Sequence, residues 1–219
     1  MTIHAERKAH WENIYQTKRL EDVSWYQKKP ETSLAYFENI DLEAKIIDIG
    51  GGDSFLVDFL LDLGFKNISV LDISEKAIER AKVRLGEKAK KIQWIVSDSA
   101  DFQTDETFDV WHDRAAFHFL NTEEDIKKYK QNLYRATTAE SKIILASFSD
   151  KGPKKCSGIE ITQYNETDFR LRFEPEFQLV DSQIVSHQTP FDSSQEFIYA
   201  QFQKKKKRRA NTRLEHPYE

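Results

Sequence analysis

The sequence predicts an α/β fold: a doubly wound, mostly parallel sheet of seven strands with an antiparallel hairpin at its C-terminal side. First, a short β-branched run at 45–49 is followed by three consecutive glycines and then by an amphipathic helix. Second, strand and helix patterns alternate along the chain, which is typical of a parallel sheet with helices on both faces. Third, two extended segments near the C-terminus have no helix between them, which indicates an antiparallel pair at a sheet edge.

The elements follow in a regular order after an aromatic-rich segment, 1–44, which we expect to form a helical lid over the sheet's carboxyl edge. Ser74 is a favoured N-cap, and Gly64 and Gly86 are typical helix stops. The expected parallel strands are 45–49, 67–71, 92–96, 108–112 and 142–148. The expected helices are 53–63, 74–85, 123–134 and 166–173, and the expected hairpin strands are 177–187 and 195–203.

The 219 residues are enough for one domain, which we place at 1–203, with 204–219 as a basic, disordered tail. The net charge is −4, but residues 204–209 read KKKKRR, which leaves −10 for the rest of the chain. An acidic body repels polyanions, so nucleic acid is not an expected partner. Only the tail has the charge to attract one.

Several classes of protein are excluded by composition. The single cysteine, Cys156, excludes a disulfide framework and a zinc site built on several thiolates, so we expect no metal and a reducing compartment. The most apolar stretch, 55–65, is interrupted by Asp58 and Asp62, so no membrane span is expected. The first eight residues lack the apolar run of a signal peptide. We therefore expect a cytoplasmic protein without membrane contact.

The candidate site lies at the carboxyl ends of the strands, where ligands bind in open parallel sheets. Four strand ends carry informative residues, namely the glycine turn 50–52, Asp72, Asp98 and the run 112–114. Asp72 lies 22 positions after Gly50, near the spacing at which an acidic residue receives ribose hydroxyls. This arrangement fits any ligand that contains adenosine.

The glycine turn argues against a phosphate-bearing ligand. The dinucleotide fingerprint requires a third glycine where this chain has Phe55, and the charge of Asp53 would repel pyrophosphate. A P-loop is excluded because no Gly-Lys-Ser/Thr occurs. A ligand with adenosine but no phosphate therefore fits better.

These residues resemble a known family. Residues 46–54 (IIDIGGGDS) and 71–74 (LDIS) are similar to motif I and the acidic loop of class I S-adenosylmethionine (SAM)-dependent methyltransferases, which have a Rossmann-like sheet. Ser54 replaces the third glycine of the motif, and the resemblance covers about residues 44–203. Residues 10–15, 23–27 and 113–116 are similar to the thiopurine methyltransferase-like and small bacterial methyltransferase branch.

The resemblance implies SAM as cofactor and a role for each matching residue. The cofactor-binding residues it implies are Trp25 and Tyr26 (closing over the cofactor), Asp48, Gly50 and Gly52 (methionine portion), Asp72 (ribose), Ile73 (adenine face), and Asp98 with Ser99 (adenine amino group). The catalytic candidates are His112, Asp113 and Arg114: Asp113 or Arg114 would face the methyl group, and His112 or Asp113 could remove a proton. His118, a further candidate base, is expected to be a hydrogen-bonded structural histidine instead.

Three functions remain open for such a chain. The expected one is transfer of a methyl group to a small-molecule acceptor by in-line displacement, given the chain's size and its N-terminal lid. A protein lysine methyltransferase would need an open groove, and a non-catalytic regulatory protein could bind SAM through the same residues. Trp11 and Tyr15 fit core packing and cofactor contact equally well, and Cys156 is expected to have no chemical role.

Overall fold

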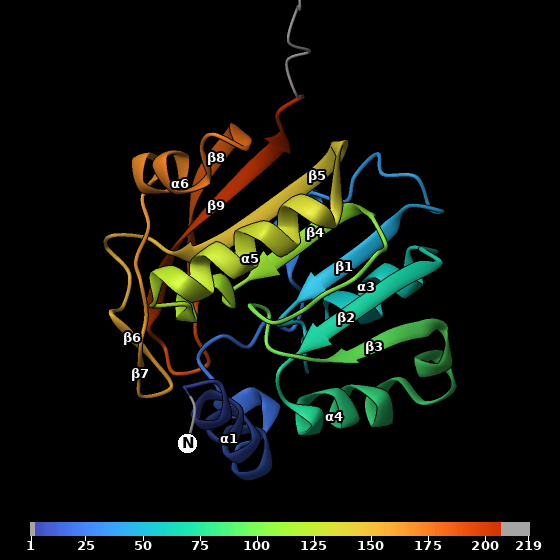
Figure 1. Ribbon diagram of the computed structural model, residues 1–219. Coiled ribbons are helices and arrows are strands. Elements are labelled where there is room, and N and C mark those ends of the chain that lie inside the picture. Colours follow the sequence, from blue (N-terminus) through green and yellow to red (C-terminus); the bar gives the residue numbers. More distant parts are fainter. Residues whose placement is uncertain (1–2, 207–219) are drawn as a thin grey trace, which may run out of the picture.

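A seven-stranded sheet with strand order β3-β2-β1-β4-β5-β9-β8 forms the centre of the computed structural model, which describes residues 3–206 (Figure 1). The strands are β1 (Lys45–Ile49), β2 (Asn67–Asp72), β3 (Ile92–Val96), β4 (Phe108–Arg114), β5 (Thr137–Phe148), β8 (Phe177–Gln188) and β9 (Ser194–Lys204). Only the pairs β5–β9 and β8–β9 are antiparallel in this sheet. The predicted fold class is thus confirmed, including the C-terminal hairpin.

Successive residues of each central strand point to opposite faces, and each face has its own core. On one face, Ile47 and Trp111 pack with residues of α5 (Glu123–Arg135) and α6 (Glu166–Phe173). On the other, Ile46 and Val110 pack with residues of α3 (Leu56–Asp62) and α4 (Glu75–Leu85). Both faces of the sheet are therefore buried, as the continuous apolar strands predicted.

Helix ends follow the local sequence. The Ser74 side chain accepts a hydrogen bond from the Ala77 backbone N–H at 3.2 Å, so it is the N-cap of α4. Gly86 ends this helix with a positive φ of 57°. Glu12 adds a second cap, because its carboxylate accepts from the backbone N–H groups of Glu75 and Lys76. The start and the end of α4 are thus both specified by side chains near them.

The N-terminal segment forms α1 (Ile3–Thr17), the short helix η1 (Leu20–Asp22) and α2 (Glu31–Ala35). α1 lies at the edge of the sheet toward which the arrowheads of β1 and β2 point (Figure 1). The hairpin of β6 (Lys155–Cys156) and β7 (Ile159–Glu160) lies at the same edge, where the sequence predicted only a polar loop. The strand ends are therefore covered by segments from both halves of the chain.

Several boundaries differ from the prediction by a few residues, those of β5 and β9 among them. β5 begins at Thr137 rather than at residue 142, and β9 extends to Lys204, the first residue of the predicted tail. The Lys204 ammonium donates to the carbonyls of Tyr134 and Thr137, which holds this residue in the fold. The predicted disorder of the remaining tail concerns mostly residues 207–219, which lie outside the described residues.

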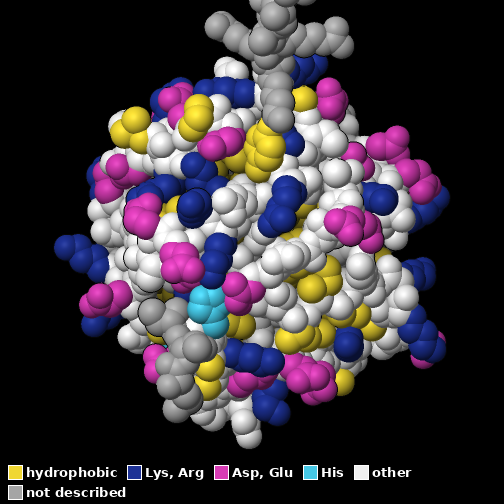
Figure 2. Space-filling view, viewed as in Figure 1, with side chains coloured by type: hydrophobic (Ala, Val, Ile, Leu, Met, Phe, Trp, Pro, Cys, Tyr) yellow, Lys and Arg dark blue, Asp and Glu magenta, His cyan; other side chains and the backbone are white. Residues whose placement is uncertain are grey.

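The surface carries both signs of charge. On the face seen in Figure 2, acidic and basic side chains are interspersed rather than gathered into regions of one sign. Within residues 3–206, no helix has the length and apolar character needed to cross a membrane.

Candidate active site

The turn between β1 and α3 consists of three consecutive glycines, 50–52. The first and third have positive φ angles of 67° and 36°, which glycine adopts without steric cost. A Cβ on the first would lie 2.6 Å from the Cβ of Ala116. A Cβ on the second would collide with the Asp48 carboxylate, and a Cβ on the third with the Asp72 carboxylate. The turn is therefore packed so closely that only glycine fits at each position.

Two cavities lie beside this turn and share Tyr15, Trp25, Gly50 and Arg114 as walls. We call the first the strand-end cavity; its floor is formed by Asp72, Ile73, Asp98, Ser99, Ala115 and Ala116, and its cover by Arg7, Trp11, Phe119, Leu120, Phe148 and Cys156. We call the second the glycine-turn cavity; it is lined further by Ser33, Asp48, Gly51, Ser54, Phe55 and His112. The structure thus brings most of the predicted residues together around one turn.

Asp72 ends β2 on the floor of the strand-end cavity. Its Oδ1 accepts a hydrogen bond from the Ser74 backbone N–H at 2.8 Å. Burial raises the pKa of this carboxyl to about 7, and the negative charges of Asp48, Glu12 and Asp53 add to the effect. The next residue, Ile73, also lines the cavity and supplies an apolar surface. Gly52, by contrast, lines neither cavity, and its missing side chain leaves room for the Asp72 carboxylate.

Asp98 and Ser99 line the far end of the strand-end cavity, after β3. The Asp98 carboxylate is held on two sides, by the Arg7 Nη1 at 2.8 Å and by the Ala100 backbone N–H at 2.9 Å. Any adenine amino group there would share this carboxylate with an arginine of α1. The role of Arg7 could not be predicted from the sequence, because nothing in the pattern of α1 distinguishes Arg7 from a solvent-exposed cation.

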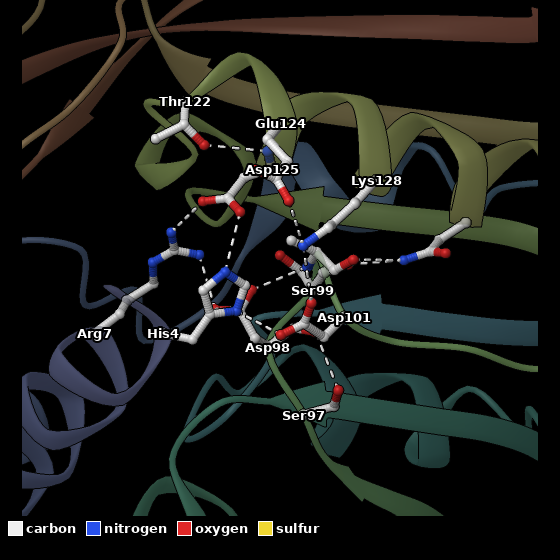
Figure 3. Close-up of polar contacts among 12 residues, drawn as sticks. His4, Arg7, Ser97, Asp98, Ser99, Asp101, Thr122, Glu124, Asp125 and Lys128 are labelled. Carbon is white, nitrogen blue, oxygen red and sulfur yellow. Dashed lines mark hydrogen bonds and ion pairs between the residues drawn. The ribbon is translucent and has the colours of Figure 1, made fainter. Parts of the chain in front are cut away.

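The contacts of Arg7 belong to a larger group that we call the α1 clamp: His4 and Arg7 against Asp98, Asp101 and Asp125. Figure 3 shows the two α1 side chains pointing toward the three carboxylates. Arg7 Nη2 lies 2.7 Å from Asp125, and His4 lies 2.5 Å from Asp101 and 3.1 Å from Asp125. Burial opposes ionisation of Asp125, but the hydrogen bond and charge of Arg7 bring its pKa below the usual value. The clamp joins α1 to the end of β3 and to the start of α5.

Asp48 and His112 occupy neighbouring strands at paired positions of β1 and β4. His112 Nδ1 lies 2.7 Å from Asp48 Oδ1, and His112 Nε2 lies 2.9 Å from the Ser33 hydroxyl of α2. All three side chains are buried, at 1–3% exposed. His112 therefore contacts the glycine-turn cavity with both ring nitrogens already hydrogen-bonded.

Asp113 lines neither cavity, because β4 turns its side chain toward the opposite face of the sheet. Its carboxylate accepts from the Tyr129 hydroxyl at 2.7 Å and from the backbone N–H groups of Ala116 and Phe117. Burial raises its pKa to about 6. Asp113 thus holds the turn after β4, rather than facing a ligand as the sequence suggested.

Arg114 lies where the two cavities meet. Its Nε donates to the Tyr199 hydroxyl at 3.0 Å, its Nη1 donates to the Trp25 carbonyl at 3.3 Å, and its guanidinium lies 4.7 Å above the Phe197 ring. Nη2 is buried without a hydrogen-bond partner, and within residues 3–206 no carboxylate is paired with Arg114. Burying a cation without a counter-charge costs free energy, which an anion beside it would offset.

The two aromatic residues expected to close over the cofactor, Trp25 and Tyr26, both line a cavity. Trp25 lines both cavities and packs edge-to-face on Trp11, with ring centroids 5.7 Å apart. Tyr26 lines only the second of them, the glycine-turn cavity, and packs on Phe55. Trp11 and Tyr15, which the sequence left between core and site, both line the strand-end cavity, and Trp11 is also part of the core.

Two further residues, His118 and Cys156, lie at the cavity, and the first of them differs from expectation. Both ring nitrogens of His118 lack a hydrogen-bond partner in the described part of the chain, so the expected hydrogen-bonded histidine is wrong. Burial lowers its pKa to about 3, and its ring stacks on Phe148, 5.0 Å away. Cys156 lines the cavity because the β6–β7 hairpin folds over it, and burial raises the pKa of its thiol to about 11. Neither position has a motif by which the sequence could reveal it.

Comparisons with known proteins agree with this geometry. Residues 46–140 match a family model described as a methyltransferase domain. The chain is 28% identical over 117 residues to the eEF1A lysine and N-terminal methyltransferase of Mus musculus. That match covers 53% of this chain but 17% of the mouse protein, so the chain spans only a small part of this relative's length.

Two solved structures share the fold over nearly all of the chain. A SAM-dependent methyltransferase from Anabaena variabilis superposes with a TM-score of 0.73 at 16% identity, covering 94% of this chain and 96% of that one. The 1,6-didemethyltoxoflavin-N1-methyltransferase of Burkholderia thailandensis, bound to 1,6-didemethyltoxoflavin and S-adenosylhomocysteine, superposes with a TM-score of 0.68 at 13% identity. It covers 94% of this chain and 92% of that one.

Proposed function

We propose that this chain, a class I SAM-dependent methyltransferase, transfers a methyl group to a small-molecule acceptor that binds beside the adenosine of the cofactor, against the part of the strand-end cavity lined by Trp11, Phe119 and Cys156. Its cofactor is SAM, as the methyltransferase domain at 46–140 indicates. We also propose that the chain belongs to the thiopurine methyltransferase-like and small bacterial methyltransferase branch, which residues 10–15, 23–27 and 113–116 resemble. The buried thiol of Cys156 is consistent with the cytoplasmic location that we also propose.

The charges around the cavities fit the cofactor. The glycine-turn cavity is lined by one carboxylate, Asp48, and one guanidinium, Arg114. A free amino acid carries an ammonium and a carboxylate, so these two side chains would hold the methionine portion, with Arg114 on its carboxylate. Asp72 would accept the ribose hydroxyls beside Ile73 and the adenine. Asp98 would meet the adenine amino group next to Ser99.

The protein contributes position and exclusion of water. When bound, SAM supplies an electrophilic methyl group on its sulfonium. Trp11, Trp25 and Phe119 cover the place where acceptor and methyl group would meet, and the short side chains of Ala115 and Ala116 leave space below them. Holding two reactants in line is worth up to roughly 7–11 kcal/mol of the barrier. His112 contacts only the other cavity, so we assign it no proton from the acceptor.

A small acceptor is supported above all by the cover of the strand-end cavity. Five of its residues are apolar and at most 9% exposed, namely Trp11, Phe119, Leu120, Phe148 and Cys156. Such an apolar wall favours a compact, largely apolar acceptor. The structure of the Burkholderia methyltransferase likewise contains a small molecule, 1,6-didemethyltoxoflavin.

The test is to follow the methyl group. Purified protein and SAM with a radiolabelled methyl group are added to a cell extract separated into a low-mass filtrate and a protein fraction. We expect label in the filtrate, and none in a reaction with Asp72→Ala. Label in the protein fraction would support the protein methyltransferase that the name of the mouse relative suggests. Binding of SAM without label in either fraction would support a non-catalytic protein.

A further inference from the structure

We propose that Ser33 and His112 are positioning residues that orient the Asp48 carboxylate toward the amino-acid end of the cofactor. This inference rests on the proposed function. It gives the predicted catalytic residue His112 a different task, carried out through Asp48 and not on the acceptor.

The three side chains form one buried chain of hydrogen bonds from three elements. Asp48 Oδ1 lies 2.7 Å from His112 Nδ1, and His112 Nε2 lies 2.9 Å from Ser33 Oγ. Asp48 and His112 are directly paired in the β1–β4 ladder, so their side chains leave the same face of the sheet. Phe37 packs against the imidazole with ring centroids 6.0 Å apart. The ring is thus fixed by contacts on several sides.

The direction of the hydrogen bonds follows from the partners. A carboxylate only accepts, so Nδ1 of His112 carries the hydrogen that Asp48 receives. In a neutral imidazole Nε2 is then an acceptor, and the Ser33 hydroxyl donates to it. Asp48 therefore selects the tautomer, and the Ser33 hydroxyl pairs with the remaining ring nitrogen and holds the imidazole in the orientation that reaches Asp48.

Holding one oxygen of Asp48 fixes the other. Oδ2 lies against Gly51, at the place that a Cβ would occupy, and both residues line the glycine-turn cavity. Asp48 is the one carboxylate lining this cavity in the described part of the chain. An ammonium group in the cavity has no other anion beside it there, so the orientation of this single side chain decides how well an amino acid is bound.

Comparing two ligands distinguishes orientation of Asp48 by Ser33 and His112 from a general contribution of these residues to the fold. S-adenosylhomocysteine carries the amino-acid end, whereas 5′-methylthioadenosine has the same adenosine and lacks that end. In isothermal titration we expect Ser33→Ala and His112→Phe to weaken S-adenosylhomocysteine binding about tenfold. The affinity for 5′-methylthioadenosine should stay within about twofold of the wild type. His112→Asn, which returns a donor to Asp48, should recover most of the loss.

Ser141→Ala is the matched control. Ser141 is also buried and hydrogen-bonded, donating to the Phe108 carbonyl at 2.7 Å, but it belongs to β5 and lies beside the start of β4, away from His112. It should leave both affinities unchanged. Equal weakening of the two ligands by Ser33→Ala, or no weakening, would overturn the inference while the proposed function stands. A wild type that binds neither ligand would overturn the proposed function itself. If His112→Phe does not fold, Ser33→Ala decides alone.

Discussion

The Asp72 carboxyl is buried at a cost in stability to the folded protein. Its pKa of about 7 lies well above that of an exposed aspartate, because burial disfavours the charge. In the folded protein it is therefore protonated at pH 5 and largely ionised at pH 8. The stability that comes from holding this proton is present at low pH and is lost as the pH rises through about 7.

Asp72→Asn should consequently stabilise the protein more at pH 8 than at pH 5, by a difference of the order of 2 kcal/mol, because the folded protein carries the disfavoured charge only at the higher pH. The amide oxygen can still accept from the Ser74 N–H, so the loop after β2 is kept. Urea unfolding at the two pH values measures this. S-adenosylhomocysteine binding should fall at least tenfold in the same variant. A gain of equal size at both pH values would show that the charge of Asp72 is not the cause.

Substitutions at Gly50 and Gly86 distinguish two costs of adding a Cβ: strain in the backbone and steric collision with a neighbouring side chain. Both have positive φ, at 67° and 57°, but only Gly50 has a neighbour within 4 Å of an added Cβ, which is Ala116. Gly86→Ala should cost about 1–2 kcal/mol from strain alone. Gly50→Ala should cost clearly more, and it should also abolish S-adenosylhomocysteine binding. Equal losses of unfolding free energy would mean that the turn can move away from Ala116.

At the scale of the elements, the α1 clamp decides whether the strand-end cavity is covered. The three side chains of its main contacts are little exposed, at 13% for Arg7, 7% for Asp98 and 4% for Asp125. Arg7→Ala leaves two carboxylates without their cation and should cost of the order of 2 kcal/mol. Hydrogen exchange should become faster in α1 while β1 and β4 keep their protection.

Arg19→Ala is the control for the clamp. Arg19 pairs with Asp22 in the same N-terminal segment, but its side chain is 80% exposed. Exposed pairs contribute little, so neither stability nor exchange of α1 should change. Unchanged exchange in Arg7→Ala would show that α1 is held by its apolar contacts alone.

The elements themselves were largely predictable, because periodicity and caps are local. The errors have physical causes. The helix expected at 53–63 begins only at Leu56; it buries Leu56, Val57 and Leu60, whereas Leu63 at its C-cap is 55% exposed. The β6–β7 hairpin is two residues per strand, too short for any pattern, and it is the element that places Cys156 over the cavity.

At the scale of the whole molecule, cofactor binding should be visible as thermal stabilisation. A ligand at 100 times its dissociation constant adds about 2.7 kcal/mol to the folded state. For a chain of this size that corresponds to a rise in Tm of roughly 5–11 °C. Differential scanning fluorimetry should show this rise with S-adenosylhomocysteine and none with NAD. A rise with NAD alone would remove the basis of the methyltransferase proposal.

The site was predictable only in part, for a reason of topology. Strand-end residues such as Asp48 and Asp72 lie next to recognisable turns, so their position in the fold can be predicted from the sequence. The pairing of His112 with Ser33 joins positions 79 residues apart, and that of Arg7 with Asp98 joins positions 91 apart. Such contacts depend on how the sheet is ordered and on where α1 and α2 settle. Acceptor specificity depends on the same contacts.

The contacts of Arg114 also determine when its site can form during synthesis of the chain. Its guanidinium is held by Tyr199 and Phe197, which belong to β9, inserted between β5 and β8. While the ribosome has released only the first five strands, the glycine turn can form, but the β9 residues that contact Arg114 have not yet been made. The nascent chain therefore exposes the β5 edge until β9 emerges, and this is the interval in which a chaperone or a neighbouring chain could occupy that edge.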